Sequence, residues 1–338
     1  MNTTDRIDWI DKAKGVGIFL VVTAHVFLNA SAPILQKLAK FIYLFHMPLF
    51  FMLSGMLYKP EVFSVLFKKR VVSLLIPYTA FLFLLTIKSL IGTAAHSYGE
   101  ALKYMSQIIY GGYNLKGWVG VFWFISCLFL TQLAYNALIN CAGGKTYNPL
   151  ARPVVFVILL CSSLTLLTTQ VRLPLAAEVV PIAMVFFWNG HLIRAQNLLN
   201  SNKMLVLSVL CASICVFLYV DGYTALIAFD MKPSLFGLPV VSIVFAVSLV
   251  VVVLKAIIFI SNVKYIGEIM ASIGSASLVI MYLSQPINLT LRDRHWPDFF
   301  IVLLSIILPY LFYSFIKLNW ISRLLLLGIS NKKTPVIR

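Results

Sequence analysis

Three titratable side chains stand out among those in the long apolar stretches of this sequence: His25, His46 and Glu178. A neutral imidazole can take a proton from a hydroxyl group, and a nearby carboxylate can orient the ring and stabilise the imidazolium that forms. Ionisable groups in apolar segments are costly and are therefore candidates for function. The sequence predicts a catalytic base at His25 or His46, with Glu178 as the orienting carboxylate. The alternatives are histidines that only pack or hydrogen-bond, and a surface ion pair between Glu178 and Arg172.

The elements that must position these residues are membrane-spanning helices. Of the 338 residues, 61% are apolar and 11% are charged, and the mean hydropathy is +0.94, whereas a soluble domain carries about 25% charged residues. A spanning helix needs about 20 apolar residues and satisfies its own backbone polar groups. We predict an all-α polytopic helical bundle that forms a single domain over residues 1–338, with about ten transmembrane helices. The expected spans are roughly 10–29, 41–58, 71–90, 117–139, 153–169, 174–193, 203–220, 238–260, 269–288 and 299–317.

The positive charges indicate an orientation for the bundle. Placing the N-terminus in the cytoplasm puts 18 of the 27 lysines and arginines on the inner side, as the positive-inside rule requires. Both termini are then expected in the cytoplasm. In this topology His25, His46 and Glu178 all fall in the outer third of the membrane. The longest loop, about residues 91–116, is expected outside, with aromatic residues that either sit at the interface or help to bind a sugar.

Other kinds of site have little support. The histidines lack the i, i+4 spacing of a zinc helix, the cysteines are not clustered, and there is no phosphate-binding Walker loop or GxSxG elbow. The net charge of +16 lies in short loops between spans and is a topology signal. We therefore expect no metal site, no permanently bound cofactor and no nucleic-acid partner.

The beginning of the chain resembles a known family. The run from Arg6 to Gly15, followed by His25, is similar to the opening signature of the integral-membrane acyltransferase-3 family, which transfers acyl groups, usually acetyl, to extracytoplasmic sugars. Lys14 and His25 are 11 residues apart, which is 20° past three full turns of helix, so they share one face about 16 Å apart along the axis. That geometry suits a cytoplasmic donor and a reactive centre deeper in the membrane.

Further short motifs match the family in order and cover essentially the whole chain. They are Phe45–Gly55, which resembles the second-span motif of fucose O-acetylase-like members, Phe67–Arg70, Pro77-Tyr78, Trp123-Phe124, Gly190, Tyr265–Gly267 and Ser277–Tyr282. Two positions depart from the pattern. Ser73 stands where many members have a second basic residue, and Ser284 stands where many end the ninth span with a histidine.

The resemblance implies that acetyl-CoA is the cytoplasmic donor and that a sugar hydroxyl on the outer side is the acceptor. Lys14 and Arg70 would contact donor phosphates through charge-assisted hydrogen bonds. His25 would act as general base or as a transient acyl carrier, and Trp123 would stack on a sugar ring or on the donor. Lys14 and Arg70 could instead serve only as positive charges that set the topology, under the positive-inside rule. Trp123 could instead anchor its helix at the membrane interface.

The leading hypothesis is therefore a membrane O-acetyltransferase that acts on a cell-surface or lipid-linked glycan. The protein is expected in the bacterial cytoplasmic membrane, with membrane lipids around it. A transporter or flippase for a sugar or lipid-linked sugar is the alternative from another class, since ten spans with intramembrane histidines fit it physically. A succinyl or other short-chain acyltransferase is the third possibility. The oligomeric state is left open.

Overall fold

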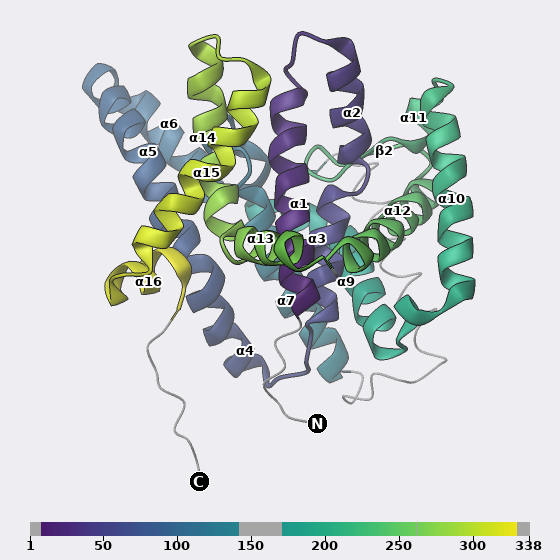
Figure 1. The fold of residues 1–338 in the computed structure, drawn as a ribbon. Coiled ribbons are helices and arrows are strands. Elements are labelled where there is room, and N and C mark those ends of the chain that lie inside the picture. Colours follow the sequence, from purple (N-terminus) through teal and green to yellow (C-terminus); the bar gives the residue numbers. More distant parts are fainter. Residues whose placement is uncertain (1–7, 142–170, 262, 330–338) are drawn as a thin grey trace.

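A computed structural model describes residues 8–141, 171–261 and 263–329. The chain forms a helical bundle (Figure 1), which confirms the predicted all-α membrane fold. The strands in the described residues form a single short hairpin, in which Phe229 faces Phe236. The main elements are α1 (Asp8–Phe27), α2 (Pro33–Tyr43), α3 (His46–Met56), α4 (Phe63–Arg70), a π-helical turn (Val71–Leu75), α5 (Ile76–His96), α6 (Tyr98–Tyr110), α7 (Trp123–Cys141), α9 (Val180–Ala195), α10 (Asn202–Val220), α11 (Thr224–Ile227), β1 (Phe229–Asp230), β2 (Leu235–Phe236), α12 (Pro239–Ile260), α13 (Lys264–Ser275), α14 (Ser277–Asp293), α15 (Asp298–Ile316) and α16 (Trp320–Leu327). Short 3-10 turns lie at Gly112–Asn114, Gly117–Val119, Pro174–Val179 and Leu198–Asn200.

Within the described ranges, seven segments are long and apolar enough to cross a bilayer, and the bent pair α13 and α14 would make eight. They coincide with the predicted spans other than 10–29 and 153–169. The first of these two is α1, whose opening turns carry four charged residues and so reduce its apolar length. The other, 153–169, lies outside the described residues, as does Arg6. The count of ten and the cytoplasmic termini stay predictions.

Two predicted spans are not straight helices. The segment 41–58 is divided between α2 and α3, because Pro48 in the first turn of α3 has no N–H to donate to Leu44. The segment 269–288 is divided between α13 and α14, which meet at an angle of 75°. An apolar run specifies burial in lipid but not direction, so neither break follows from hydropathy.

The loop predicted over 91–116 is also wrong in part. α5 continues to His96, and α6 follows directly. The Ser97 side chain accepts a hydrogen bond from the backbone N–H of Glu100 at 3.3 Å. This is the S-x-x-E pattern that begins a helix, and it was the local signal for α6.

Glycines bring two helix pairs into close contact. Gly15 of α1 and Gly274 of α13 lie at one crossing, and Gly55 of α3 and Gly190 of α9 lie at another. At each of the four, an added Cβ would overlap a backbone carbonyl group of the facing helix. Small residues allow membrane helices to approach in this way. The family motifs that include Gly15, Gly55 and Gly190 therefore have a packing reason.

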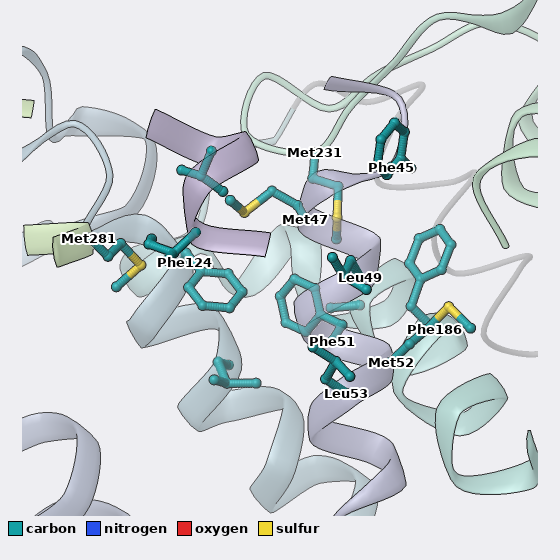
Figure 2. Packing of buried hydrophobic residues seen from close by; sticks show 14 of the residues in the cluster. Phe45, Met47, Leu49, Phe51, Met52, Leu53, Phe124, Phe186, Met231 and Met281 are labelled. Atoms are coloured by element: carbon teal, nitrogen blue, oxygen red, sulfur yellow. The ribbon is translucent and has the colours of Figure 1, made fainter. Parts of the chain in front are cut away.

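The core is centred on α3, where nine of its eleven residues are buried. Figure 2 shows its side chains packed among residues from α7, α9, α14 and the hairpin: Leu49, Phe51, Met52 and Leu53 lie among Phe124, Phe186, Met231 and Met281. A helix that is apolar on every side is stable only when it is surrounded. Because α3 is held on all sides, its first residue, His46, has a fixed position.

Candidate active site

A cavity of about 250 Å³ lies near the start of α1. Lys14 and Arg70 both line it, together with the polar side chains of Ser54, Gln132 and Ser277. The remaining walls are apolar and come from α1, α3 and the residue after it, the π-helical turn, α7 and α14. The two predicted donor-binding cations therefore face the same space, which we call the inner cavity.

The cations of the inner cavity differ in their partners. The Lys14 ammonium lies 3.1 Å from a carboxylate oxygen of Asp11. The Nε atom of Arg70 is buried, and it has no hydrogen-bond partner among the described residues. A guanidinium that lines a cavity and keeps a nitrogen without a protein partner is suited to an anionic ligand. Arg70 also begins the π-helical turn that contains Ser73, a type of irregularity that is common at functional sites.

A second cavity, of about 360 Å³, lies toward the other end of α1 and is called the outer cavity. His25, His46 and Trp123 all line it, so the structure brings together three of the predicted site residues. The other polar side chains on its walls are Tyr43, Lys116, Asp230, Lys232 and Gln285. Met281 of α14 lines both cavities, so the two spaces adjoin at this residue.

The histidines of the outer cavity form an aromatic cluster with Tyr43. The His25 and His46 ring centroids are 6.5 Å apart, and Tyr43 lies 5.7 Å from the first and 4.7 Å from the second. The Tyr43 hydroxyl is 3.0 Å from Nδ1 of His25. Two rings from α1 and α3 are thus placed side by side by a tyrosine at the break between α2 and α3.

Hydrogen bonds set the tautomers of these rings. Nδ1 of His46 lies 3.0 Å from the carbonyl oxygen of Ile42. A carbonyl oxygen can only accept, so this Nδ1 carries the hydrogen and the neutral ring keeps its lone pair on Nε2. At His25 a hydroxyl can donate or accept. When Nδ1–H donates to the Tyr43 oxygen, Nε2 of His25 is also left as a base.

The C-terminal end of α1 is held by α14. Arg292 donates at 2.7 Å to the carbonyl oxygens of Val26 and Asn29, and Asn288 donates at 3.4 Å to that of His25. The last carbonyl groups of a helix have no partners within it, and here α14 supplies them. This contact fixes the turn that carries His25 against the helix that carries Gln285.

The β1–β2 hairpin closes one side of the outer cavity. The Lys232 ammonium donates at 2.7 Å to each of the carbonyl oxygens of Leu115 and Gly120, so it ties the hairpin to the segment before α7. Burial lowers the pKa of Lys232 to about 8, an effect that Asp230 partly opposes. Burial raises the pKa of the neighbouring Asp230 to about 6. Asp230 and His25 line the same cavity.

Glu178 does not join this cluster. One of its oxygens accepts a hydrogen bond from the backbone N–H of Leu173 at 3.1 Å, and the other is 4.0 Å from the Arg172 guanidinium. It lies in a 3-10 turn in which Leu175 and Ala176 have positive φ angles, and it lines neither of the two cavities. Its surroundings match the ion-pair alternative better than the orienting role.

Several residues of the site were not singled out by the sequence. Tyr43, Asp230 and Gln285 line the outer cavity, and the buried Oε1 of Gln285 has no hydrogen-bond partner in the part of the chain that the structure describes. Ser284, one of the two departures from the family pattern, is buried beside it. The available signals were a tyrosine three residues before His46 and a charged D-x-K pair between apolar segments.

Comparisons with known proteins identify the family. A family model described as an acyltransferase domain matches residues 7–330. No curated protein and no solved structure matches the chain significantly, and the fucose O-acetylase-like subgroup stays a prediction. Because the family match covers nearly the whole sequence, this multi-pass membrane protein belongs to the acyltransferase-3 family.

Proposed function

We propose that this acyltransferase moves an acetyl group from cytoplasmic acetyl-CoA to a sugar hydroxyl on the outer side of a bacterial cytoplasmic membrane. One observation carries the proposal: a cavity with two cations and a cavity with two histidines adjoin at Met281. Along α1 the cavity with the cations comes first and the cavity with the histidines second, which is the order expected for a cytoplasmic donor and an outer acceptor. Lys14 lies at the inner cavity and His25 at the outer one, about 16 Å farther along the helix.

The inner cavity supports binding of the donor. Lys14 and the unpartnered Nε of Arg70 would hold the phosphates of acetyl-CoA through charge-assisted hydrogen bonds. The Gln132 amide donates at 2.7 Å to Ser54, and its buried Oε1 is without a partner among the described residues. This oxygen can accept from an amide N–H of the donor arm. The thioester would then lie toward Met281.

The outer cavity supports the transfer itself. Nε2 of His25 or His46 takes the proton from the acceptor hydroxyl as its oxygen attacks the thioester carbonyl carbon. The new C–O bond forms, the C–S bond breaks, and the thiolate of CoA receives the proton from the imidazolium. A transient acyl group on His25 would give the same products in two steps.

Trp123 would hold the acceptor sugar. Its side chain is only 5% exposed and lines the outer cavity, a position that does not fit an interfacial anchor. Aromatic rings pack well against the apolar face of a ring ligand while polar side chains fix its orientation. Asp230 and Gln285, on the same cavity, offer acceptor oxygens for sugar hydroxyls.

The proposal is tested by acetyl transfer in membranes that contain wild-type protein or His25→Ala. Labelled acetyl-CoA and surface glycan are supplied, and acyl groups on the glycan are counted by mass spectrometry. We expect loss of the acetyl group with glycan length unchanged. His96→Ala is the control, because His96 is exposed at the end of α5 and lines neither cavity.

Other results would overturn the proposal. Acetylation that persists in His25→Ala at equal protein level contradicts the role of His25. Movement of sugar across vesicles without any need for acetyl-CoA would establish the transporter alternative. A mass increase that corresponds to succinyl or another short acyl group would keep the enzyme class and replace the donor.

A further inference from the structure

The outer cavity continues into a groove at the side of the bundle. This groove, of about 620 Å³, is lined by residues of α2 on one side and of α10, α11 and the hairpin on the other. Figure 1 labels these elements. It shares Leu28, Tyr43 and Asp230 with the outer cavity. A molecule in the groove therefore reaches the tyrosine that contacts His25. We call this space the side groove.

The walls of the side groove combine two chemistries. Most of the lining is apolar and comes from Leu44, Val220, Ala225, Ala228, Phe229 and Leu235. Two lysines, Lys37 and Lys40, line it from α2. They are three residues apart, so they lie on one face of the helix. Neither ammonium forms an ion pair within the described residues.

The groove is bounded by a helix that faces lipid. Only 17% of the spanning window of α10 is buried within the protein, and Val220 at its end is 79% exposed. α2 and α10 are nevertheless tied together, because the Tyr219 hydroxyl donates to the Lys37 carbonyl oxygen at 2.5 Å. An acyl or isoprenoid chain can therefore lie along α10 while its polar end enters between two fixed walls.

We infer that the side groove binds the acceptor as a lipid-linked glycan, with its lipid chain against α10, its phosphate at Lys37 and Lys40, and its sugar in the outer cavity. Two positive charges beside an apolar wall complement a phosphate attached to a hydrocarbon chain. A free glycan has no hydrocarbon chain that could pack against that apolar wall. This inference rests on the proposed acetyl transfer, and it narrows the acceptor to glycans that carry a lipid phosphate.

The test compares two forms of one acceptor. Purified protein in lipid nanodiscs receives labelled acetyl-CoA with either polyprenyl diphosphate-linked glycan, extracted from membranes of the source cells, or the same glycan released by mild acid. We expect at least a tenfold higher kcat/KM for the linked form. Equal rates for the two forms would overturn the inference and leave acetyl transfer intact. Failure of transfer to both forms would contradict the proposed function itself.

Variants of the groove give a second readout. The double variant Lys37→Glu/Lys40→Glu should reduce the preference for the linked form by tenfold or more, through KM for the acceptor. Lys103→Glu is the matched control, since Lys103 is an exposed lysine on α6 that does not line the groove. An unchanged preference in the double variant would contradict the assignment of the two lysines.

A third variant changes the shape of the groove without its charge. Ala228→Trp fills the lining, and it should reduce binding of polyprenyl phosphate measured by native mass spectrometry, with acetyl-CoA binding as the check that the protein is folded. Equal displacement of the bound probe by phosphatidylglycerol would show a general site for anionic lipids, and it would overturn the assignment to the acceptor.

Discussion

Tyr43 and His25 are joined by a hydrogen bond of 3.0 Å between the phenolic oxygen and Nδ1. The two residues belong to different helices, and Tyr43 is the last residue of α2, directly before the break that leads to His46 in α3. The break thus places one tyrosine against both histidines. The hydrogen bond occupies Nδ1 of His25 and leaves Nε2 as the free ring nitrogen, so under the proposed mechanism Tyr43 is a positioning residue.

Tyr43→Phe should lower kcat by about tenfold to a hundredfold, since removal of the partner of a catalytic ring weakens its orientation and tautomer preference. Steady-state acetyl transfer measures this effect, and the pH–rate profile should shift with it. Tyr110→Phe is the control, because it removes a 2.7 Å hydrogen bond to a backbone carbonyl oxygen away from the cavity. An unchanged profile would show that Tyr43 only packs.

His25 and His46 should behave as a unit if both serve one proton transfer. Each single change to Gln is expected to reduce kcat by about a hundredfold or more. The double variant should then be little slower than the slower single variant, because groups that act together are not additive. Single-turnover transfer rates measure all three. If the fold-reduction of kcat in the double variant equals the product of the two single reductions, the two histidines have independent roles.

The sequence predicted that His25 and His46 share one level along their helices, but it did not predict which residues lie beside them. Counting residues from the span ends placed His25 and His46 at one level, and their rings lie 6.5 Å apart. Glu178 was placed at the same level, yet it lies beside Arg172 in a 3-10 turn. Hydropathy fixes how far a residue lies along a span, whereas its neighbours depend on helix packing. Tyr43 was missed for the same reason, since 41–58 was read as one continuous helix.

Arg70→Ala should raise KM for acetyl-CoA by about tenfold to a hundredfold and change kcat much less. The guanidinium of Arg70 lines the inner cavity and its Nε is without a partner among the described residues, so its removal costs the ligand a charge-assisted contact. Binding of acetyl-CoA by calorimetry checks the result. Lys68→Ala is the control, because Lys68 is an exposed cation on the same helix. Equal losses in both variants would indicate a general effect of surface charge.

Gly55→Ala should destabilise the protein by about 1–3 kcal/mol, the usual cost of overpacking. The added Cβ would overlap the carbonyl oxygen of Phe187 and force α3 away from α9. At Gly92 an added Cβ meets no atom within 4 Å. Gly92→Ala should therefore raise the free energy of unfolding by roughly 0.5–1 kcal/mol, because alanine is the better helix former. The thermal midpoint in detergent micelles measures both. A fall of the same size in both variants would contradict the close helix contact.

Asp230 should make stability depend on pH in the acidic range. The pKa of its carboxyl is about 6 in the folded protein and 3.8 in a free side chain. Between these values the folded state holds more protons than the unfolded state, so this group lowers the free energy of unfolding as pH rises from 4 to 6. Asp230→Asn removes the titrating group. Between pH 4 and 6.5 the free energy of unfolding of the wild type should fall by as much as about 3 kcal/mol more than that of the variant. Lys232, with a pKa of about 8, stays charged throughout this window. Thermal midpoints of both proteins at several pH values measure the difference, and parallel curves would show that Asp230 is ionised in the cavity without cost.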